Sequence, residues 1–472
     1  MIAVLRHELM TLIREGRFWV AGALLTALML GSILVGRDNQ QAKAQAATRV
    51  TQELRTQWES QKDKNPHSAA HFGTFVIKPA GSVSWLDPGI EPYLGSVVFL
   101  EAHTRNEFEH RPATDSTTLR HFGYFSPAFL LQTVAPLIII LFCFSAFAAD
   151  RESGALRLVL ATGVEPAVLV AGKVLGSLIG VALLVLPSLL LAFLVLAGGE
   201  GAGGEGGASL ARLSLLALGY LLYFATFAGV TLAVSAFSPK SQVALATMVL
   251  IWITTCFILP RTLSDLAAAR HPLPSKAVFS DQIARETLKG LDGHDAQDER
   301  RAPLLKATLK RYGVKRIEDL PVNFDAIALQ ESEEYTSQLY SREFNRISDQ
   351  LEAQAAVTRQ AATLAPYFAI RNWSMAASGT DLAHHRRFSD AVERYRLNLI
   401  RTLNTNLIEN SRTGDYGYYV EREFWKTIRP FQYDEPELAW ALRSTWSQLA
   451  TLAVWAAASI GLCLVAATRL RP

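Results

Sequence analysis

Residues 129–149 read FLLQTVAPLIIILFCFSAFAA, an apolar stretch without a charged side chain. A helix needs roughly 17–25 mainly apolar residues to cross the hydrocarbon core of a bilayer, which is about 30 Å thick. Inside lipid the segment must be helical, because a helix satisfies its own backbone polar groups. This stretch therefore predicts a transmembrane helix and places the chain among membrane proteins.

Five further stretches have the same apolar character, and together they predict six transmembrane helices: 18–35, 129–149, 174–197, 210–237, 243–259 and 449–468. Two long polar blocks, 36–128 and 260–448, hold most of the charge. We expect an all-α membrane protein whose polar blocks form a mainly helical domain with a minor β element. A cleaved signal peptide is the alternative for 18–35, but its apolar run exceeds the 7–15 residues usual there, which favours an uncleaved anchor.

Basic residues occur at both chain ends and in the short loops 150–173 and 238–242, namely Arg6, Arg14, Arg17, Arg151, Arg157, Lys173, Lys240, Arg469 and Arg471. The positive-inside rule places these segments in the cytoplasm and the two polar blocks in the periplasm of a bacterial inner membrane. The three cysteines all lie in predicted spans, so we expect no disulfides in the outer blocks.

The first 17 residues predict an amphipathic helix, with Ile2, Leu5, Leu9 and Leu12 on one face. We expect an interfacial elbow that breaks at Gly16, and the alternative is a short cytosolic extension of the first span. Beyond that span, the composition of 42–64 predicts a helical stalk.

Three local patterns describe the remaining outer segments. Thr74–Ile77 is β-prone, and a long helix is expected over 388–407, with Thr380 or Asp381 capping the helix that leads into it. The glycine-rich segment 198–209 predicts a flexible external loop.

Nine of the ten histidines lie in the outer blocks. His67 and His71 have the i, i+4 spacing that holds a metal on a helix, but Pro66 and Gly73 bracket them and no zinc-protease pattern follows. We therefore expect no metal site. No nucleophile elbow or catalytic cysteine pattern is present, so we expect no enzymatic activity in this chain.

The loop 150–173 carries the strongest functional signal. It reads DRESGALRLVLATG over 150–163 and ends in Gly172-Lys173. This resembles the cytoplasmic loop of ABC-2 type transporter permeases, in which an acidic-Gly-small-Leu motif opens a coupling helix that docks onto the ATPase subunit. The resemblance implies that coupling to the ATPase rests on Glu152, Ser153, Gly154, Leu156 and Arg157.

The apolar side chains after Gly154 support a docking role, because a free cytosolic loop would be more polar. The alternative is that this run packs beneath the bundle. In the outer blocks, Tyr312-Gly313-Val314, EDLPVNF at 318–324 and PYFAIR at 366–371 resemble a permease subgroup with a domain of unknown function between the fifth and sixth spans. The permease of the nitrous oxide reductase maturation system is a more distant relative.

The chain contains no Gly-x4-Gly-Lys-Ser/Thr loop, so we expect no cofactor here and assign ATP and Mg²⁺ to a separate ATPase dimer. The other expected partners are a second permease chain, the same or paralogous, the lipid bilayer and a periplasmic protein, but no nucleic acid. No charged residue lies mid-span, which argues against ion-coupled transport. The expected function is the permease subunit of an ATP-driven exporter, and the alternative is a mechanotransmission or sensor subunit through which nothing crosses.

Overall fold

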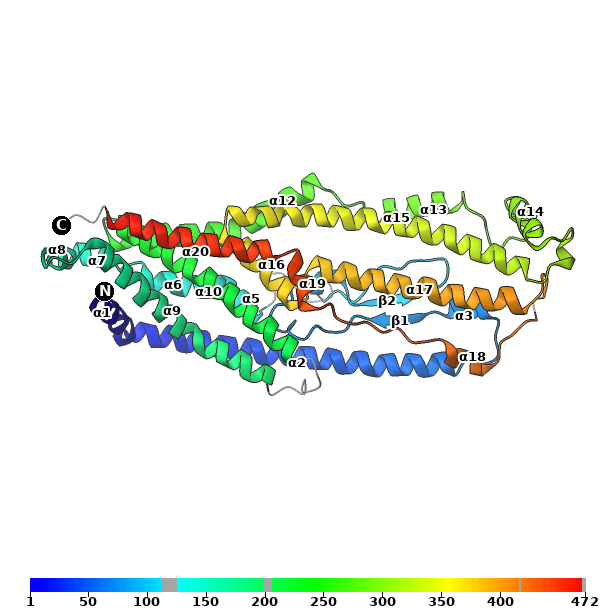
Figure 1. Cartoon of the computed structure of the whole chain (residues 1–472), viewed down its shortest axis with the longest axis horizontal. Coiled ribbons are helices and arrows are strands. Elements are labelled where there is room, and N and C mark those ends of the chain that lie inside the picture. The colour runs from blue at the N-terminus through cyan, green and yellow to red at the C-terminus, as the bar shows by residue number, and fades with distance from the viewer. Residues whose placement is uncertain (113–124, 198–205, 416, 469–472) are drawn as a thin grey trace.

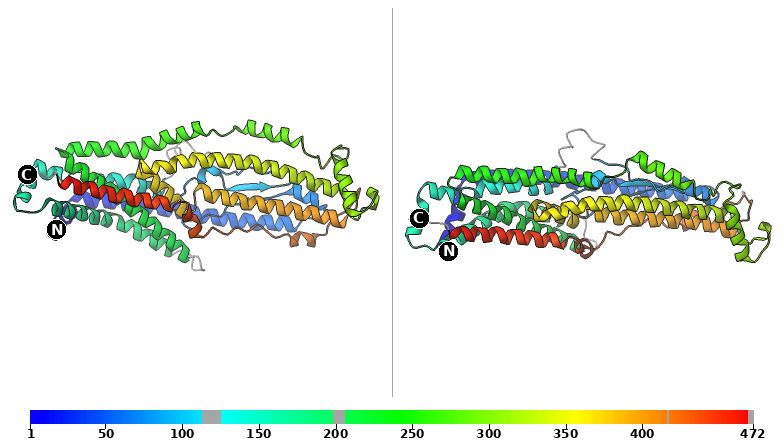
Figure 2. Two further views of the ribbon diagram at one scale, coloured as in Figure 1. Left: turned by 45° about the horizontal axis from the view of Figure 1, so that its top comes forward. Right: turned by 90° about the horizontal axis from the view of Figure 1, so that it is seen from above.

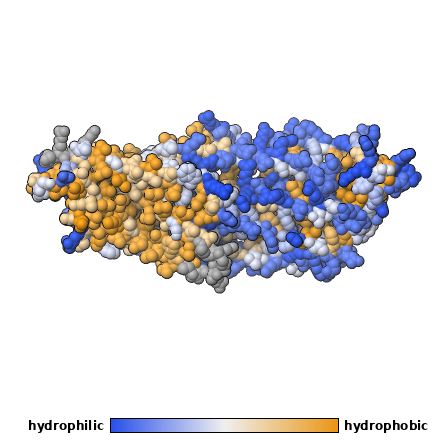
Figure 3. Space-filling view, viewed as in Figure 1, coloured by the Kyte–Doolittle hydropathy of each residue, from blue (hydrophilic) through white to orange (hydrophobic). Residues whose placement is uncertain are grey.

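The computed structural model describes residues 1–112, 125–197, 206–415 and 417–468. Figure 1 shows an elongated molecule with a helical bundle at one end and a second helical part, here called the distal domain, at the other. On the face shown in Figure 3, most of the surface of the bundle is apolar and most of the surface of the distal domain is hydrophilic. This division is the one expected when only the bundle contacts lipid.

Within the described residues, six helices are long and apolar enough to cross a membrane: Gly16–Glu59, Pro127–Glu152, Pro166–Leu196, Ala208–Phe237, Ser241–Arg270 and Trp446–Ala467. The prediction of six spans is confirmed. The first span belongs to α2 (Gly16–Glu59), which continues past the bundle as the expected stalk. Most of the glycine-rich loop, residues 198–205, lies outside the described residues, as do Arg469 and Arg471.

The elbow helix α1 (Ile2–Arg14) ends at an extended Glu15, and α2 begins at Gly16. Helix α1 packs against the start of α9 (Pro166–Ala197). A Cβ added at Gly172, Gly176 or Gly180 would lie within 2.7–2.8 Å of a side-chain atom of α1. These glycines, one turn apart, therefore let the two helices approach closely.

The second and fifth spans each contain one π-helical turn. The second consists of α5 (Pro127–Phe129), η2 (Leu130–Val134), α6 (Ala135–Cys143) and α7 (Ala148–Glu152). The fifth consists of α11 (Ser241–Ile253), η3 (Thr254–Ile258) and α12 (Leu259–Arg270). The fourth and sixth spans are the unbroken helices α10 (Gly206–Phe237) and α20 (Trp446–Ala467).

The distal domain is built on two long helices, α15 (Phe324–Gln360) and α17 (Leu382–Asn410), which lie side by side (Figure 2). The minor β element is an antiparallel pair, β1 (Thr74–Ile77) and β2 (Val97–Leu100), with Thr74 opposite Leu100. The shorter helices are α3 (Pro66–Phe72), α4 (Glu91–Leu94), α13 (Lys276–Thr287), α14 (Arg301–Tyr312), α16 (Pro366–Ser378), α18 (Arg422–Thr427) and α19 (Leu438–Arg443).

Two local expectations can be compared directly with these helices. Asp381 caps α17, because its side chain accepts a hydrogen bond from the His384 amide. The expectation that Pro66 and Gly73 would prevent a helix around His67 and His71 was wrong. Pro66 occupies the first turn of α3 and Gly73 follows its end, which are positions that suit these residues.

Candidate functional site

The loop expected to couple to an ATPase lies at the end of the bundle, beside α1 and opposite the distal domain (Figure 1). It folds into α7 and α8 (Ala155–Ala161), with Gly154 at the corner between them. The φ of Gly154 is +78°, a conformation that side chains with a Cβ rarely adopt. No atom of this chain lies within 4 Å of a Cβ added there, so the glycine is required by the turn and not by close packing.

Glu152 binds the first residue of the fifth span. The amide of Ser241 donates to Glu152 Oε1 at 2.8 Å, and the Ser241 hydroxyl donates to Oε2 at 3.1 Å. A carboxylate at the start of α11 is favoured by the helix dipole. We expected Glu152 at the start of the coupling helix, but it ends α7 and caps α11 instead.

Arg151 binds the end of the fourth span. Its guanidinium donates to the carbonyl oxygens of Ala236 and Ser238, both at 2.6 Å. These carbonyls lie where α10 ends, so a cation is favourable there. Arg151 and Glu152 together connect the loop to α10 and α11. This role was not predicted, because in the sequence Arg151 is visible only as a cytoplasmic charge.

Lys173 joins three elements at the base of the bundle. Its Nζ lies 3.0 Å from Glu8 Oε2 of α1, 2.9 Å from Asp150 Oδ2 of α7 and 2.7 Å from the Ala146 carbonyl. The side chain is buried, and a buried charge requires such partners. Lys173 therefore fixes the elbow helix and the α7–α8 loop to α9. These contacts were not predicted, because only the tertiary structure brings the residues together.

Helix α8 has two contrasting faces. Leu156 is buried and packs with the core of the bundle. Arg157 is exposed, and Leu158 has 72% of its surface accessible. Ser153 lies at the corner, where its hydroxyl accepts a hydrogen bond from the Ala155 amide at 3.4 Å. Leu156 therefore packs beneath the bundle, whereas Leu158 on the same helix is exposed.

The π-helical turn of the second span is held by donors from neighbouring spans. Pro136 has no amide hydrogen, so it leaves a carbonyl of the preceding turn without its helical partner. The Tyr223 hydroxyl donates to the Gln132 carbonyl at 2.8 Å, and Trp252 Nε1 donates to the Thr133 carbonyl at 2.9 Å. These bonds join the second, fourth and fifth spans at one level.

A buried polar network connects the bundle to the distal domain. Asp87 Oδ2 accepts from the Ser374 hydroxyl at 2.5 Å, and that hydroxyl lies 3.0 Å from the Tyr220 hydroxyl of α10. Burial raises the pKa of Asp87. Nearby, Trp373 Nε1 donates to the Leu215 carbonyl at 3.0 Å. Helix α10 is therefore attached to the α7–α8 loop at one end and to α16 at the other.

Comparison with known families accounts for most of the chain. The family described as ABC-2 family transporter protein matches residues 2–302, more than half of the chain. A domain of unknown function (DUF3526) matches residues 276–434, which include α13 to α18 of the distal domain. No curated protein matches the chain. The six spans and this match together show that the chain belongs to the ABC-2 transporter family, as a multi-pass membrane subunit with an additional domain.

Proposed function

We propose that this chain is the permease subunit of an ATP-driven exporter, and that α8 receives the motion of a separate ATPase. The observation that carries the proposal is the arrangement of the α7–α8 loop. Arg151, Glu152 and Lys173 attach it to three spans and the elbow helix, while Leu158 is exposed to a partner. A movement imposed on α8 would therefore reach α10 and α11 directly.

The route from α8 to the distal domain follows α10. Its end beside the loop is bound by Arg151, and its other end is bound to α16 by the Tyr220 and Trp373 contacts. Arg212 of α10 also donates to the Ala377 carbonyl at 3.0 Å and to the Pro436 carbonyl at 2.8 Å. A rigid helix with bonds at both ends can transmit a displacement along its whole length.

A complete transporter in this proposal contains two permease chains, the same or paralogous, and an ATPase dimer that binds ATP and Mg²⁺. A cavity in the bundle, lined by Met29, Leu189 and Phe224, has a volume of about 40 Å³, room for only a few water molecules. The fifth span is the least covered by its own chain, and Leu250 is 64% exposed. A cargo path between two chains, beside such faces, fits this geometry better than a path through one bundle.

The decisive experiment compares two exposed leucines. Leu158→Asp changes α8, whereas Leu288→Asp changes a residue after α13 that is 79% exposed. Co-expressed with the ATPase, both variants should insert like the parent, because neither side chain is packed. The Leu158 variant should lose ATPase co-purification and the Leu288 variant should retain it. Retention by both would contradict the role of α8.

Membrane orientation has a separate test. We propose that the distal domain is periplasmic and both chain ends are cytoplasmic, as the basic residues of the short loops indicate. The three native cysteines are buried, so an impermeant thiol reagent should label only an introduced cysteine. A cysteine at Asn410 should react with an impermeant reagent on intact cells, and one at Ser153 only after the inner membrane is opened. The reverse pattern would contradict the orientation.

The second candidate is a mechanotransmission subunit that moves a periplasmic partner without transporting anything. The small bundle cavity and the direct attachment of α10 to the distal domain favour it. Spin-label distances between the distal domains of the assembled complex should then change on ATP binding. ATP-dependent release of a cargo from vesicles that contain the complex would support the exporter. ATP-dependent movement of the distal domains without any release would support this alternative.

A further inference from the structure

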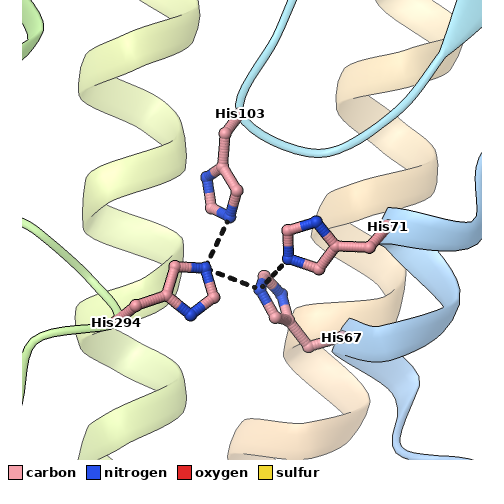
Figure 4. Close-up of side chains that lie close together, drawn as sticks. All are labelled: His67, His71, His103 and His294. Carbon is pink, nitrogen blue, oxygen red and sulfur yellow. Dashed lines mark hydrogen bonds between the residues drawn. The ribbon is translucent and has the colours of Figure 1, made fainter.

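Four histidines from three separate segments meet in the distal domain. His67 and His71 lie on α3, His103 follows β2, and His294 lies between α13 and α14. Figure 4 shows the four rings pointing toward a common centre. Each ring offers one ligand nitrogen, and these atoms all lie within 4.8 Å of one another.

The nitrogen separations fit a tetrahedral ion. The Nε2 atoms of His67 and His71 are 3.2 Å apart, those of His67 and His294 are 3.5 Å apart, and those of His103 and His294 are 3.1 Å apart. With metal–nitrogen bonds of about 2.0–2.1 Å, tetrahedral geometry places ligand nitrogens roughly 3.3–3.4 Å from each other. These three separations need little adjustment to hold an ion.

Surrounding side chains turn two of the rings toward the centre. His67 Nδ1 lies 3.0 Å from Asn404 Oδ1, and His103 Nδ1 lies 3.0 Å from Glu333 Oε2. Both oxygens accept hydrogen bonds when Nδ1 carries the proton, so each Nε2 presents a lone pair to the other rings. An amide or carboxylate behind a histidine is the usual support of a metal ligand.

These supporting groups are themselves held in place. Asn404 Nδ2 donates to Gln330 Oε1 at 3.0 Å. Glu333 Oε1 accepts from Arg396 at 2.8 Å and from the Ser337 hydroxyl at 3.0 Å. An ion pair with the buried guanidinium of Arg396 holds this carboxylate in place behind His103.

Hydrogen bonds among the rings are the simpler explanation of the cluster. The close nitrogen contacts do follow a chain, from His71 through His67 and His294 to His103. All four ligand atoms nevertheless gather within 4.8 Å, and two of the rings, His71 and His294, are exposed to solvent. Exposed imidazoles gain little from each other in water, so convergence on a single centre favours an ion.

We propose that His67, His71, His103 and His294 form a binding site for a divalent transition-metal ion, with Zn²⁺ as the ion whose geometry fits. The site does not depend on the function proposed above. The ion would fasten the segment between α13 and α14 to α3 and to the loop after β2. It would thereby join the first outer block to the domain that follows the fifth span.

The test measures metal bound by the full chain, purified in detergent through an affinity tag without histidine. The protein is equilibrated with ZnCl₂ and desalted, and the metal is counted by mass spectrometry. The parent should retain about one zinc per chain and melt at a higher temperature with zinc, because the ion binds the folded state. The exposed pair is changed together, His71→Gln and His294→Gln, since neither side chain is buried.

This double variant should remain folded and should lose at least tenfold in zinc affinity together with the zinc-dependent rise in melting temperature. His271→Gln, at the end of α12 and outside the cluster, should bind zinc like the parent. Retention of copper or nickel that is lost in the same double variant would also support the site. If the parent retains no metal, or the double variant retains as much as the parent, the proposal is wrong.

Discussion

The bundle and the distal domain bury polar side chains in different ways. In the bundle, Arg151, Tyr223 and Trp252 donate to backbone carbonyls that helix ends or π-helical turns leave free. In the distal domain, Arg396 is 1% exposed and its guanidinium binds the carboxylates of Glu333 and Glu393. At these sites the bundle satisfies its backbone with side chains and the distal domain satisfies side chains with each other, although Lys173 and Glu8 form a buried ion pair in the bundle as well.

The environment of each region explains this difference. Lipid offers no hydrogen bonds, so every carbonyl freed by a kink needs a donor from a neighbouring helix. The surface of the distal domain contacts water, and each charge in its interior needs a partner of opposite charge. Substitutions in the bundle should therefore reduce stability most where helices approach closely. Substitutions in the distal domain should do so where they remove one partner of a buried group of charges.

The largest expected effect is the loss of Arg396. Arg396→Met leaves the buried carboxylate of Glu333 with only His103 and that of Glu393 with only the more distant Arg105, which should destabilise the distal domain by about 3–5 kcal/mol. Arg401→Met is the matched control on the same helix, because its ion pair with Glu334 is exposed and should contribute less than about 1 kcal/mol. Thermal melting of both variants in detergent checks the contrast, and equal losses would contradict it.

A smaller effect is expected where α10 packs against α20. A Cβ added at Gly229 would lie 2.9 Å from the Cβ of Ser459 and closer still to its hydroxyl. Gly229→Leu should therefore cost about 1–3 kcal/mol through overpacking. Gly461→Leu on α20 is the control, since no atom lies within 4 Å of its added Cβ. A Gly461 variant as unstable as the Gly229 variant would show that helix contact is not the cause.

The sequence predicted what local patterns determine. Apolar length identified six spans, and the Asp381 cap and the strand Thr74–Ile77 followed from residue type. The partners of Glu152 and Lys173 could not be predicted, because Ser241 and Glu8 are far away in the sequence and only packing brings them near. Local pattern also misjudged the helix around His67.

The histidine cluster shows the same limit. The spacing of His67 and His71 was visible in the sequence, but nothing local connects them to His103 or His294. Those two residues come from loops whose positions depend on how β2 and α13 pack in the distal domain. A contact between segments more than a hundred residues apart requires the tertiary structure.

The next expected effect concerns how the stability of the distal domain depends on pH. Burial, together with the charges of Lys78 and Arg111, lowers the pKa of His385 to about 3. An unfolded histidine has a pKa near 6.5, so the unfolded chain binds more protons between these values and stability falls as pH drops below about 6.5. His385→Gln should reduce this loss by about 2 kcal/mol at pH 5. Melting temperatures at pH 5 and pH 7.5 give the comparison, and an unchanged difference would contradict it.

The smallest expected effect on stability concerns Glu152, an exposed side chain of the bundle that binds a backbone group at a helix end. Its carboxylate binds the Ser241 amide at the start of α11, so Glu152→Ala should cost about 0.5–1 kcal/mol as a lost cap. Glu421 precedes α18 without a side-chain capping bond, and Glu421→Ala should be nearly neutral.

The functional effect of Glu152→Ala should exceed its effect on stability. If α8 transmits motion, this substitution loosens the loop from the fifth span while leaving Leu158 able to dock. The ATPase should then still co-purify, yet its hydrolysis should no longer respond to the permease. Leu158→Asp should instead remove the ATPase itself, so the two variants separate docking from transmission. A Glu152 variant that regulates hydrolysis like the parent would restrict this residue to a structural cap, and the path from α8 would then run through Arg151 and α10 alone.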